Sequence, residues 1–241
     1  MIAVVCLLVV GLGVGGFFAF SSPAKTSNTA AAATASASAS ASASASPSAQ
    51  AEPARTCTYP ASGTPAARNV GTPPAKPDGQ ASYQATIHTN RGDVVIHLLN
   101  SEATCTVNSF VYLAAKKYFN NTKCHRLTTT SPLFVLQCGD PTGTGSGGPG
   151  YKFSDENLAG AKYTKGTVAM ANSGPNTNGS QFFLVYQNSK LAPSYTPFGR
   201  VVKGLGIIQN VARAGSDNAN GHGDGHPKEK VVIESVTIKK T

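Results

Sequence analysis

The segment VAMANSGPNTNGSQFF, residues 168–183, decides the fold that we expect for this chain. Its two ends are apolar and read as strands, while its middle is rich in Asn, Gly, Ser and Pro, which favour turns and loops. Gln181 stands directly before two phenylalanines. Polar side chains between two strands and beside aromatic ones are typical of a groove that accepts an extended peptide.

Further strands surround this segment. Apolar and polar residues alternate over 83–89 and over 93–99 on either side of Asn90-Arg91-Gly92, which predicts a hairpin. Shorter strands are predicted at 123–127, 133–137, 166–172, 180–186, 197–202 and 230–238.

Two helices are predicted among the strands. Apolar residues from Val107 to Ala114 recur at intervals of three and four, which predicts a helix over 103–117. A similar stripe predicts a second helix over 205–214. Many short strands with only two helices favour a mainly β fold, a closed antiparallel β-barrel capped by the two α-helices.

The N-terminal third differs from this pattern. Residues 2–20 carry no charge and would form about 28 Å of apolar helix, enough to cross a bilayer. No basic residue precedes them and no signal-peptidase site follows, so we expect an uncleaved anchor at 1–20. The Ala/Ser- and Pro-rich region 21–79 is expected to be a disordered linker. Residues 80–241 are then the folded domain, outside the cytoplasm.

Four cysteines follow the predicted anchor. Cys57, Cys105, Cys124 and Cys138 are separated by 48, 19 and 14 residues, and no CxxC motif occurs among them. Zinc binding and thioredoxin-like chemistry are therefore not expected. Either disulfides or buried free thiols fit an exported domain, and three complete pairings stay open.

Composition and weak motifs exclude several other functions. The 20 Lys and Arg exceed the 11 Asp and Glu, but the excess is spread along the chain, and no nucleic acid partner is expected. Residues 143–148 satisfy GxGxxG without the strand and helix that a dinucleotide site needs, so we expect a flexible loop beside the groove. The segment 221–226 has two His and an Asp among glycines, and we expect an unstructured turn without a metal.

His125 precedes Arg126 in a predicted strand. Neighbouring strand residues face opposite sides, so we expect an inward, hydrogen-bonded and neutral His125 if Arg126 faces the groove. No Ser-His-Asp arrangement or GxSxG elbow is present, which argues against a hydrolase.

Three blocks together resemble the signature of the cyclophilin family of peptidyl-prolyl cis/trans isomerases. They are CHRL at 124–127, FVLQCGD at 134–140 and the opening segment at 168–183. The resemblance extends over nearly all of residues 80–241. It implies an isomerase that needs no cofactor and no metal, because the reaction only twists an X-Pro bond.

The resemblance also implies the roles of individual residues. Arg126 is expected to be the catalytic donor. Phe134, Val135, Phe183 and Leu191 would form an apolar slot for the proline ring, and Gln137 and Gln181 would hold the substrate backbone and orient Arg126. Phe182 is expected to support the strand from its opposite face. The predicted substrate-binding residues are Phe134, Val135, Gln137, Ala171, Asn172, Ser173, Gln181, Phe182, Phe183, Leu191 and Tyr195.

Several positions depart from the family pattern. Lys190 stands where many members have Trp, Tyr195 replaces a His, Val135 a Met and Cys138 a Gly. These changes leave Arg126 intact, so activity is expected, whereas sensitivity to cyclosporin is not implied.

We therefore expect a membrane-tethered, monomeric prolyl isomerase that binds proline-containing segments of exported proteins. One alternative is a binding module with the same slot but without meaningful turnover. A second alternative is a structural spacer of the cell envelope, suggested by the Ala/Ser-rich tether at residues 28–51. A spacer function leaves Arg126, Gln137 and Gln181 unexplained.

Overall fold

The computed structural model describes residues 55–241. The predicted anchor at 1–20 and the predicted linker as far as residue 54 lie outside the described residues. Within the described part of the chain, no helix has the length and apolar character needed to cross a membrane.

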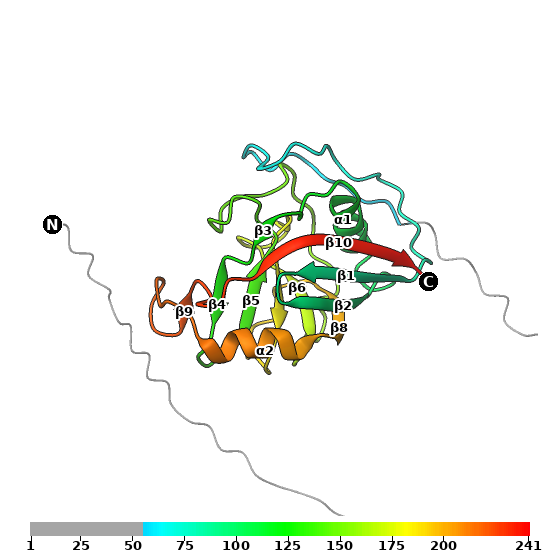
Figure 1. The fold of residues 1–241 in the computed structure, drawn as a ribbon. Coiled ribbons are helices and arrows are strands. Elements are labelled where there is room, and N and C mark those ends of the chain that lie inside the picture. Colours follow the sequence, from blue (N-terminus) through cyan, green and yellow to red (C-terminus); the bar gives the residue numbers. More distant parts are fainter. Residues whose placement is uncertain (1–54) are drawn as a thin grey trace, which may run out of the picture. The chain divides into compact units, whose positions relative to one another are not determined.

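The described chain consists mainly of short strands, with two helices (Figure 1). The strands are β1 (Tyr83–Thr89), β2 (Gly92–Leu98), β3 (Thr122–Lys123), β4 (Arg126–Thr128), β5 (Val135–Cys138), β6 (Thr167–Met170), β7 (Phe182–Val185), β8 (Pro197–Lys203), β9 (Asp224–Gly225) and β10 (Val232–Lys240). The helices are α1 (Thr104–Ala115) and α2 (Leu205–Ala214). Both predicted helices and the predicted hairpin are confirmed.

All these strands belong to one antiparallel sheet with the order β3-β10-β1-β2-β8-β6-β7-β5-β4-β9. The sheet curls, because β3 at one end and β4 near the other are separated by only Cys124 and His125 in the chain. Cys124 N–H donates to Val231 O, whereas His125 N–H donates to Gln137 O. The predicted closed barrel is thus corrected to a curled sheet, since its outermost described strands, β3 and β9, do not pair with each other.

Aromatic side chains fill the core between the sheet and α1. Phe110 of α1 lies 5.5 Å from Phe182 and 5.3 Å from Phe198, measured between ring centroids. Phe119, just after the helix, packs 5.2 Å from Phe110. Because such buried rings each stabilise a core by about 3–5 kcal/mol, this cluster fixes α1 on the sheet. In Figure 1, α1 lies above the strands and α2 below them, and buried residues of both helices belong to the same core.

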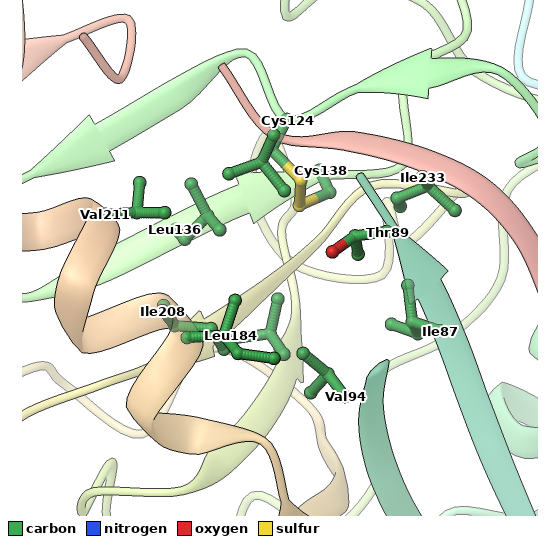
Figure 2. Close-up of a pocket in the computed structure, with 12 residues that line it drawn as sticks. Ile87, Thr89, Val94, Cys124, Leu136, Cys138, Leu184, Ile208, Val211 and Ile233 are labelled. Carbon is green, nitrogen blue, oxygen red and sulfur yellow. A yellow bond between two sulfur atoms is a disulfide. The ribbon is translucent and has the colours of Figure 1, made fainter. Parts of the chain in front are cut away.

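Helix α2 covers an apolar patch of the sheet with Ile208 and Val211, its two buried residues. Figure 2 shows both side chains directed toward side chains of the strands. They line a cavity of about 20 Å³, together with the Cys124–Cys138 disulfide. A space of this size has room for one water molecule at most, and its lining is almost entirely apolar. The cavity is therefore part of the core and not a binding site.

Residues 55–79 were expected to be disordered linker, and the structure corrects this. Cys57 is buried and forms a disulfide with Cys105 of α1, which settles one of the pairings that the sequence left open. Backbone hydrogen bonds join Cys57 N–H to Ala75 O and Ser62 N–H to Gly150 O, at 2.8 and 3.0 Å.

Side chains add to the attachment of this segment. The Tyr59 hydroxyl donates to Cys105 O at 2.8 Å, and Nη1 of Arg68 donates to the carbonyls of Tyr118 and Asn120 at 2.9 and 2.8 Å. The segment has no strand or helix of its own, so these side-chain contacts and the disulfide hold it against α1. We refer to residues 55–79 as the N-terminal segment.

Candidate active site

Three neighbouring strands bring the predicted site residues into one row. Arg126 of β4 stands opposite Gln137 of β5, and Gln137 stands opposite Phe183 of β7. Residues directly opposite each other in an antiparallel sheet project to the same face. The register therefore places a cation, an amide and an aromatic ring side by side, although they are far apart in sequence.

A chain of hydrogen bonds orients the polar members of this row. Nη1 of Arg126 donates to Oε1 of Gln137 at 3.4 Å, and Nε2 of Gln137 donates to Oε1 of Gln181 at 2.9 Å. Nε2 of Gln181 donates in turn to the carbonyls of Gly145 and Gly147, at 2.9 and 3.0 Å. Each amide is fixed by its neighbours, so Arg126 is connected through two glutamines to the glycine-rich loop.

That loop, residues 143–148, was expected to be flexible, and the structure corrects this too. Asp140 is fully buried, and its carboxylate accepts hydrogen bonds from the backbone of Thr142, Thr144, Gly145 and Gly147. Burial alone would raise the pKa of Asp140, but the hydrogen bonds from Gly147 and Thr142 outweigh it and lower the pKa below its usual value. An ionised, buried carboxylate thus holds the loop in place.

A pocket of about 500 Å³, which we call the polar groove, lies between the glycine-rich loop and the segment after β6. Five predicted site residues line it: Gln137, Ala171, Asn172, Ser173 and Gln181. Two further lining residues, Ser62 and Thr64, come from the N-terminal segment and were not predicted. The polar groove is thus lined mainly by amides, hydroxyls and backbone groups, which can hydrogen-bond an extended peptide.

An apolar cluster adjoins the polar groove, and we call it the apolar slot. Its buried members are Val135, Tyr163, Ala169, Phe183 and Val185, and its partly exposed members are Leu133, Ala161, Ala171, Leu191 and Tyr195. Five of the predicted site residues meet here: Val135, Ala171, Phe183, Leu191 and Tyr195. Ala171 belongs to both the apolar slot and the polar groove, so the two regions are contiguous.

Arg126 is also held by Asp224, a contact that the sequence did not reveal. Nε of Arg126 donates to Oδ1 of Asp224 at 2.9 Å and Nη2 donates to Oδ2 at 2.6 Å. The hydrogen bonding of Arg126 to the Asp224 carboxylate is the main reason why the pKa of Arg126 is raised above its usual value. The guanidinium has five N–H groups. Asp224 takes two and Gln137 takes one, so two are left for a ligand.

A family model described as "Cyclophilin type peptidyl-prolyl cis-trans isomerase/CLD" matches residues 84–238 of this chain. The chain belongs to the cyclophilin family. Its matched region includes every strand of the site row, the polar groove except Ser62 and Thr64, and the whole apolar slot.

Named relatives agree with this membership. The chain is 49% identical over 197 residues to "Probable peptidyl-prolyl cis-trans isomerase B" of Mycobacterium leprae, covering 76% of this chain and 66% of the relative. It is 45% identical to the protein of the same name from Mycobacterium tuberculosis strain H37Rv, again over 76% of this chain and over 63% of the relative. This cyclophilin therefore spans just under two thirds of the length of either relative.

A solved cyclophilin has the same fold. The crystal structure of a Cryptosporidium parvum cyclophilin type peptidyl-prolyl cis-trans isomerase superposes with a TM-score of 0.58 at 32% sequence identity. The match covers 66% of this chain and 99% of that chain. The mainly β architecture with two helices is thus the cyclophilin fold.

Two phenylalanines of this cyclophilin lie elsewhere than predicted. Phe134 is not in the apolar slot, because it packs against the main core, with its ring 6.1 Å from that of Tyr186. Phe182 is 0% exposed and packs against Phe110 and Phe119 in the core. This position agrees with the predicted support from the opposite face of β7, and it leaves Phe182 outside the residues that line the polar groove and the apolar slot.

His125 of this cyclophilin was expected to be buried, neutral and hydrogen-bonded. It is buried, and desolvation lowers its pKa, which favours the neutral ring. Neither Nδ1 nor Nε2 has a hydrogen-bond partner, however. The expected hydrogen bond is therefore absent from the described residues around this ring.

The segment 221–226 was expected to be an unstructured turn, and this is wrong. Residues 224–225 form β9, which pairs with β4. Asp224 stands opposite Thr128, and Gly225 stands opposite Leu127. Sequence offered no signal for this contact, because an Asp among glycines has no periodicity and lies 98 residues from Arg126.

Proposed function

We propose that this cyclophilin catalyses the cis/trans isomerisation of peptide bonds that precede proline. One observation carries the proposal: Gln137 contacts Arg126 on one side and stands opposite Phe183 of the apolar slot on the other. A peptide whose proline ring enters the apolar slot would then present its prolyl nitrogen on the side of Arg126, with its backbone along the polar groove.

Chemistry explains why these groups suffice. Amide resonance sets the barrier of about 18–20 kcal/mol, and the resonance is lost in the twisted transition state, where the prolyl nitrogen becomes basic. A hydrogen bond from a charged donor is worth about 1.5–3 kcal/mol, and it acts only once that nitrogen can accept it. Arg126 is such a donor because it stays protonated at every relevant pH. The apolar slot holds the ring while the carbonyl rotates.

The test is the isomerisation rate of a short proline peptide, followed by exchange NMR, with wild-type protein and with Arg126→Ala. Removing one preorganised donor lowers turnover by roughly 10²–10³-fold in other enzymes, and we expect a loss of about 100-fold here. Arg200→Ala is the matched control, because Arg200 is an exposed strand arginine whose Nη1 contacts only the hydroxyl of Thr164. Equal rates for wild type and Arg126→Ala would refute the proposal.

A binding module without turnover is the second candidate, and the carboxylate of Asp224 favours it. A negative charge at 2.6 Å partly neutralises Arg126 and would weaken its help to the prolyl nitrogen. The same NMR experiment separates the two functions. A binder shifts the peptide resonances without exchange between the cis and trans forms, whereas an isomerase broadens both sets.

We also propose that the domain acts outside the cytoplasm on exported proteins, tethered through residues 2–20. Two disulfides support this location, because such bonds persist in oxidising compartments. The uncharged stretch at 2–20 supports the tether. The full chain should sediment with membranes and resist alkaline extraction, whereas a chain without residues 2–20 should stay in the supernatant. Equal partitioning of both chains would contradict the tether.

A further inference from the structure

We infer that Asp224 is a positioning residue that fixes the orientation of the Arg126 guanidinium for proline isomerisation. The inference rests on the proposed function and adds to it a residue that the family signature in the sequence does not contain. The ion pair between Asp224 and Arg126 carries it, together with the way in which the chain builds the segment 216–227 around that carboxylate.

The geometry of the ion pair leaves Arg126 little freedom. Both oxygens of Asp224 are used, one for Nε and one for Nη2, so the carboxylate lies along one edge of the planar guanidinium. An arginine side chain gives up rotamer freedom when it is fixed, and a bidentate carboxylate fixes it in a single plane. The remaining edge, with Nη1, faces Gln137 and thus the groove. Asp224 therefore decides which N–H groups are presented.

Asp224 is itself held firmly. It belongs to β9, which pairs with β4, the strand that carries Arg126. Nδ2 of Asn220 donates to Oδ1 of Asp224 at 3.2 Å. The turn around it is closed by hydrogen bonds from Gly223 N–H to Oδ1 of Asn218 and from His226 N–H to Oδ1 of Asp217, at 2.8 and 2.7 Å. The carboxylate is thus attached to the catalytic strand by backbone pairing, and not by the ion pair alone.

The glycines beside Asp224 permit this close packing. A Cβ atom on Gly225 would lie 2.1 Å from Oδ1 of Asp217, and one on Gly223 would lie 2.4 Å from Cγ2 of Thr130. Gly223 also has a φ of +74°, which L side chains rarely adopt. A larger residue at Gly223 would push the turn away from Thr130, and one at Gly225 would distort the turn itself. The glycines that suggested an unstructured turn are therefore what allows Asp224 to reach Arg126.

A purely structural salt bridge would explain the contact less well. Both side chains are partly exposed, 35% for Arg126 and 25% for Asp224, and ion pairs in such positions add little to stability. The backbone pairing of β9 with β4 holds the turn without the charge. Asp224 is also ionised across the neutral range, because its hydrogen bond with Arg126 lowers its pKa. The role should therefore be visible in turnover and not in stability.

The experiment compares three variants of the full chain in the proline peptide assay. Asp224→Asn keeps the size and the hydrogen-bonding oxygen but removes the charge and the second acceptor. We expect it to lower kcat about tenfold with KM within about twofold, because a misaligned donor affects the transition state and not peptide binding. Asp224→Glu keeps the charge and should recover part of kcat. Asp93→Asn removes an exposed carboxylate from its pair with His88, 2.9 Å away, and should behave as wild type.

A second readout reports on the side chain itself. In the NMR spectrum of wild-type protein, the Nε–H group of Arg126 should give a separate, slowly exchanging signal, and in Asp224→Asn this signal should broaden or join those of the free arginines. Melting temperatures of the variants should agree within a few degrees, because a partly exposed ion pair adds little to stability. The Nε–H signal shows directly whether the guanidinium is held, so it tests the inference even if Asp224→Asn loses activity through partial unfolding. Asp224→Glu is measured in parallel as the variant that keeps the charge.

Two outcomes would overturn the inference. An unchanged kcat in Asp224→Asn, with an unchanged Nε–H signal, would mean that Gln137 and the sheet alone orient Arg126. A higher kcat would mean that the carboxylate restrains the charge of Arg126 and does not help it. Either result leaves the proposed function intact as long as Arg126→Ala is inactive. An active Arg126→Ala would remove the proposed function itself, and the two failures are therefore distinguishable.

Discussion

The two disulfides of this cyclophilin attach regions of different kinds. Cys57–Cys105 spans 48 residues and joins the N-terminal segment to α1. Cys124–Cys138 spans only 14 residues and joins two parts of the curled sheet. The first region has no regular strand, whereas the second lies among hydrogen-bonded strands. The same covalent bond therefore supplements a few isolated backbone hydrogen bonds in one region and a continuous strand ladder in the other.

The two regions also differ in their distance from the chemistry. Cys124 is two residues before Arg126, and Cys138 directly follows Gln137. The N-terminal segment contributes Ser62 and Thr64 to the polar groove, whereas the side-chain partners of Arg126 among the described residues are Asp224 and Gln137. We therefore expect the first disulfide to matter most for stability and the second for turnover.

The largest effect on stability is expected from Cys57→Ala combined with Cys105→Ala. A cross-link over this many residues is worth about 4 kcal/mol of unfolding free energy in the loop-entropy description, and we expect a loss of that size. The rate on a short proline peptide should stay within about twofold, because Arg126 and Gln137 are held by the sheet. Urea unfolding and the peptide assay measure the two quantities. A loss of turnover as large as that from removing the other disulfide would break the comparison.

A smaller loss of stability is expected from Cys124→Ala combined with Cys138→Ala. The shorter span predicts about 3 kcal/mol. Turnover should fall by about threefold or more, because the strands that carry Arg126 and Gln137 become less fixed relative to each other. The variant without Cys57 and Cys105 is the matched control, since it also loses one disulfide. Turnover equal to that of the control would show that the ladder between β4 and β5 suffices.

The smallest expected effect is a loss of stability at acidic pH, and it involves only the second of the two regions. His125 has a lowered pKa in the folded state, so its stabilisation is present above the unfolded pKa of about 6.5 and is lost as pH falls below it. Below that pH the imidazole is protonated in the unfolded chain but stays neutral in the folded domain. The free energy of unfolding then falls by up to about 1.4 kcal/mol per pH unit. Residues 55–79 contain no His, so this loss belongs to the region of Cys124.

The measurement is urea unfolding of wild type, His125→Phe and His226→Gln at pH 7.5 and pH 5.5. His125→Phe should lose about 1 kcal/mol less than wild type between the two conditions. His226→Gln is the control, because His226 is exposed and pairs with Asp217 at 2.8 Å. The same pH dependence in wild type and His125→Phe would assign the acid sensitivity to another group.

Sequence predicted the regular elements well where a local pattern determines them. The apolar stripe through Ile208 and Val211 defined α2 at both ends, because a helix buries one face and the spacing records it. The hairpin of β1 and β2 was equally legible, with Thr89 paired to Gly92 across a two-residue turn. The prediction of a closed barrel was wrong, because curling and edge pairing depend on contacts between distant strands that no local pattern specifies.

The site was predicted in part for a similar reason. Gln137 and Gln181 were identified through the family resemblance, and the structure brings them into one hydrogen-bonded chain with Arg126. Asp224 could not be found, because its partner lies far along the chain and its glycine neighbours indicate freedom, not order. The N-terminal segment was missed since it has few large apolar residues, and its order comes from a disulfide and from side chains such as Arg68.

The attachment of Cys57 to α1 also decides how the domain would respond to a pull on its N-terminal side. A force applied at residue 55 passes through the sulfur atoms of the first disulfide into α1, whose buried face includes Phe110. It bypasses β1, which starts only at Tyr83. Tension would therefore be borne by a covalent bond and a buried helix, and the hydrogen-bonded strands would not be peeled apart one by one.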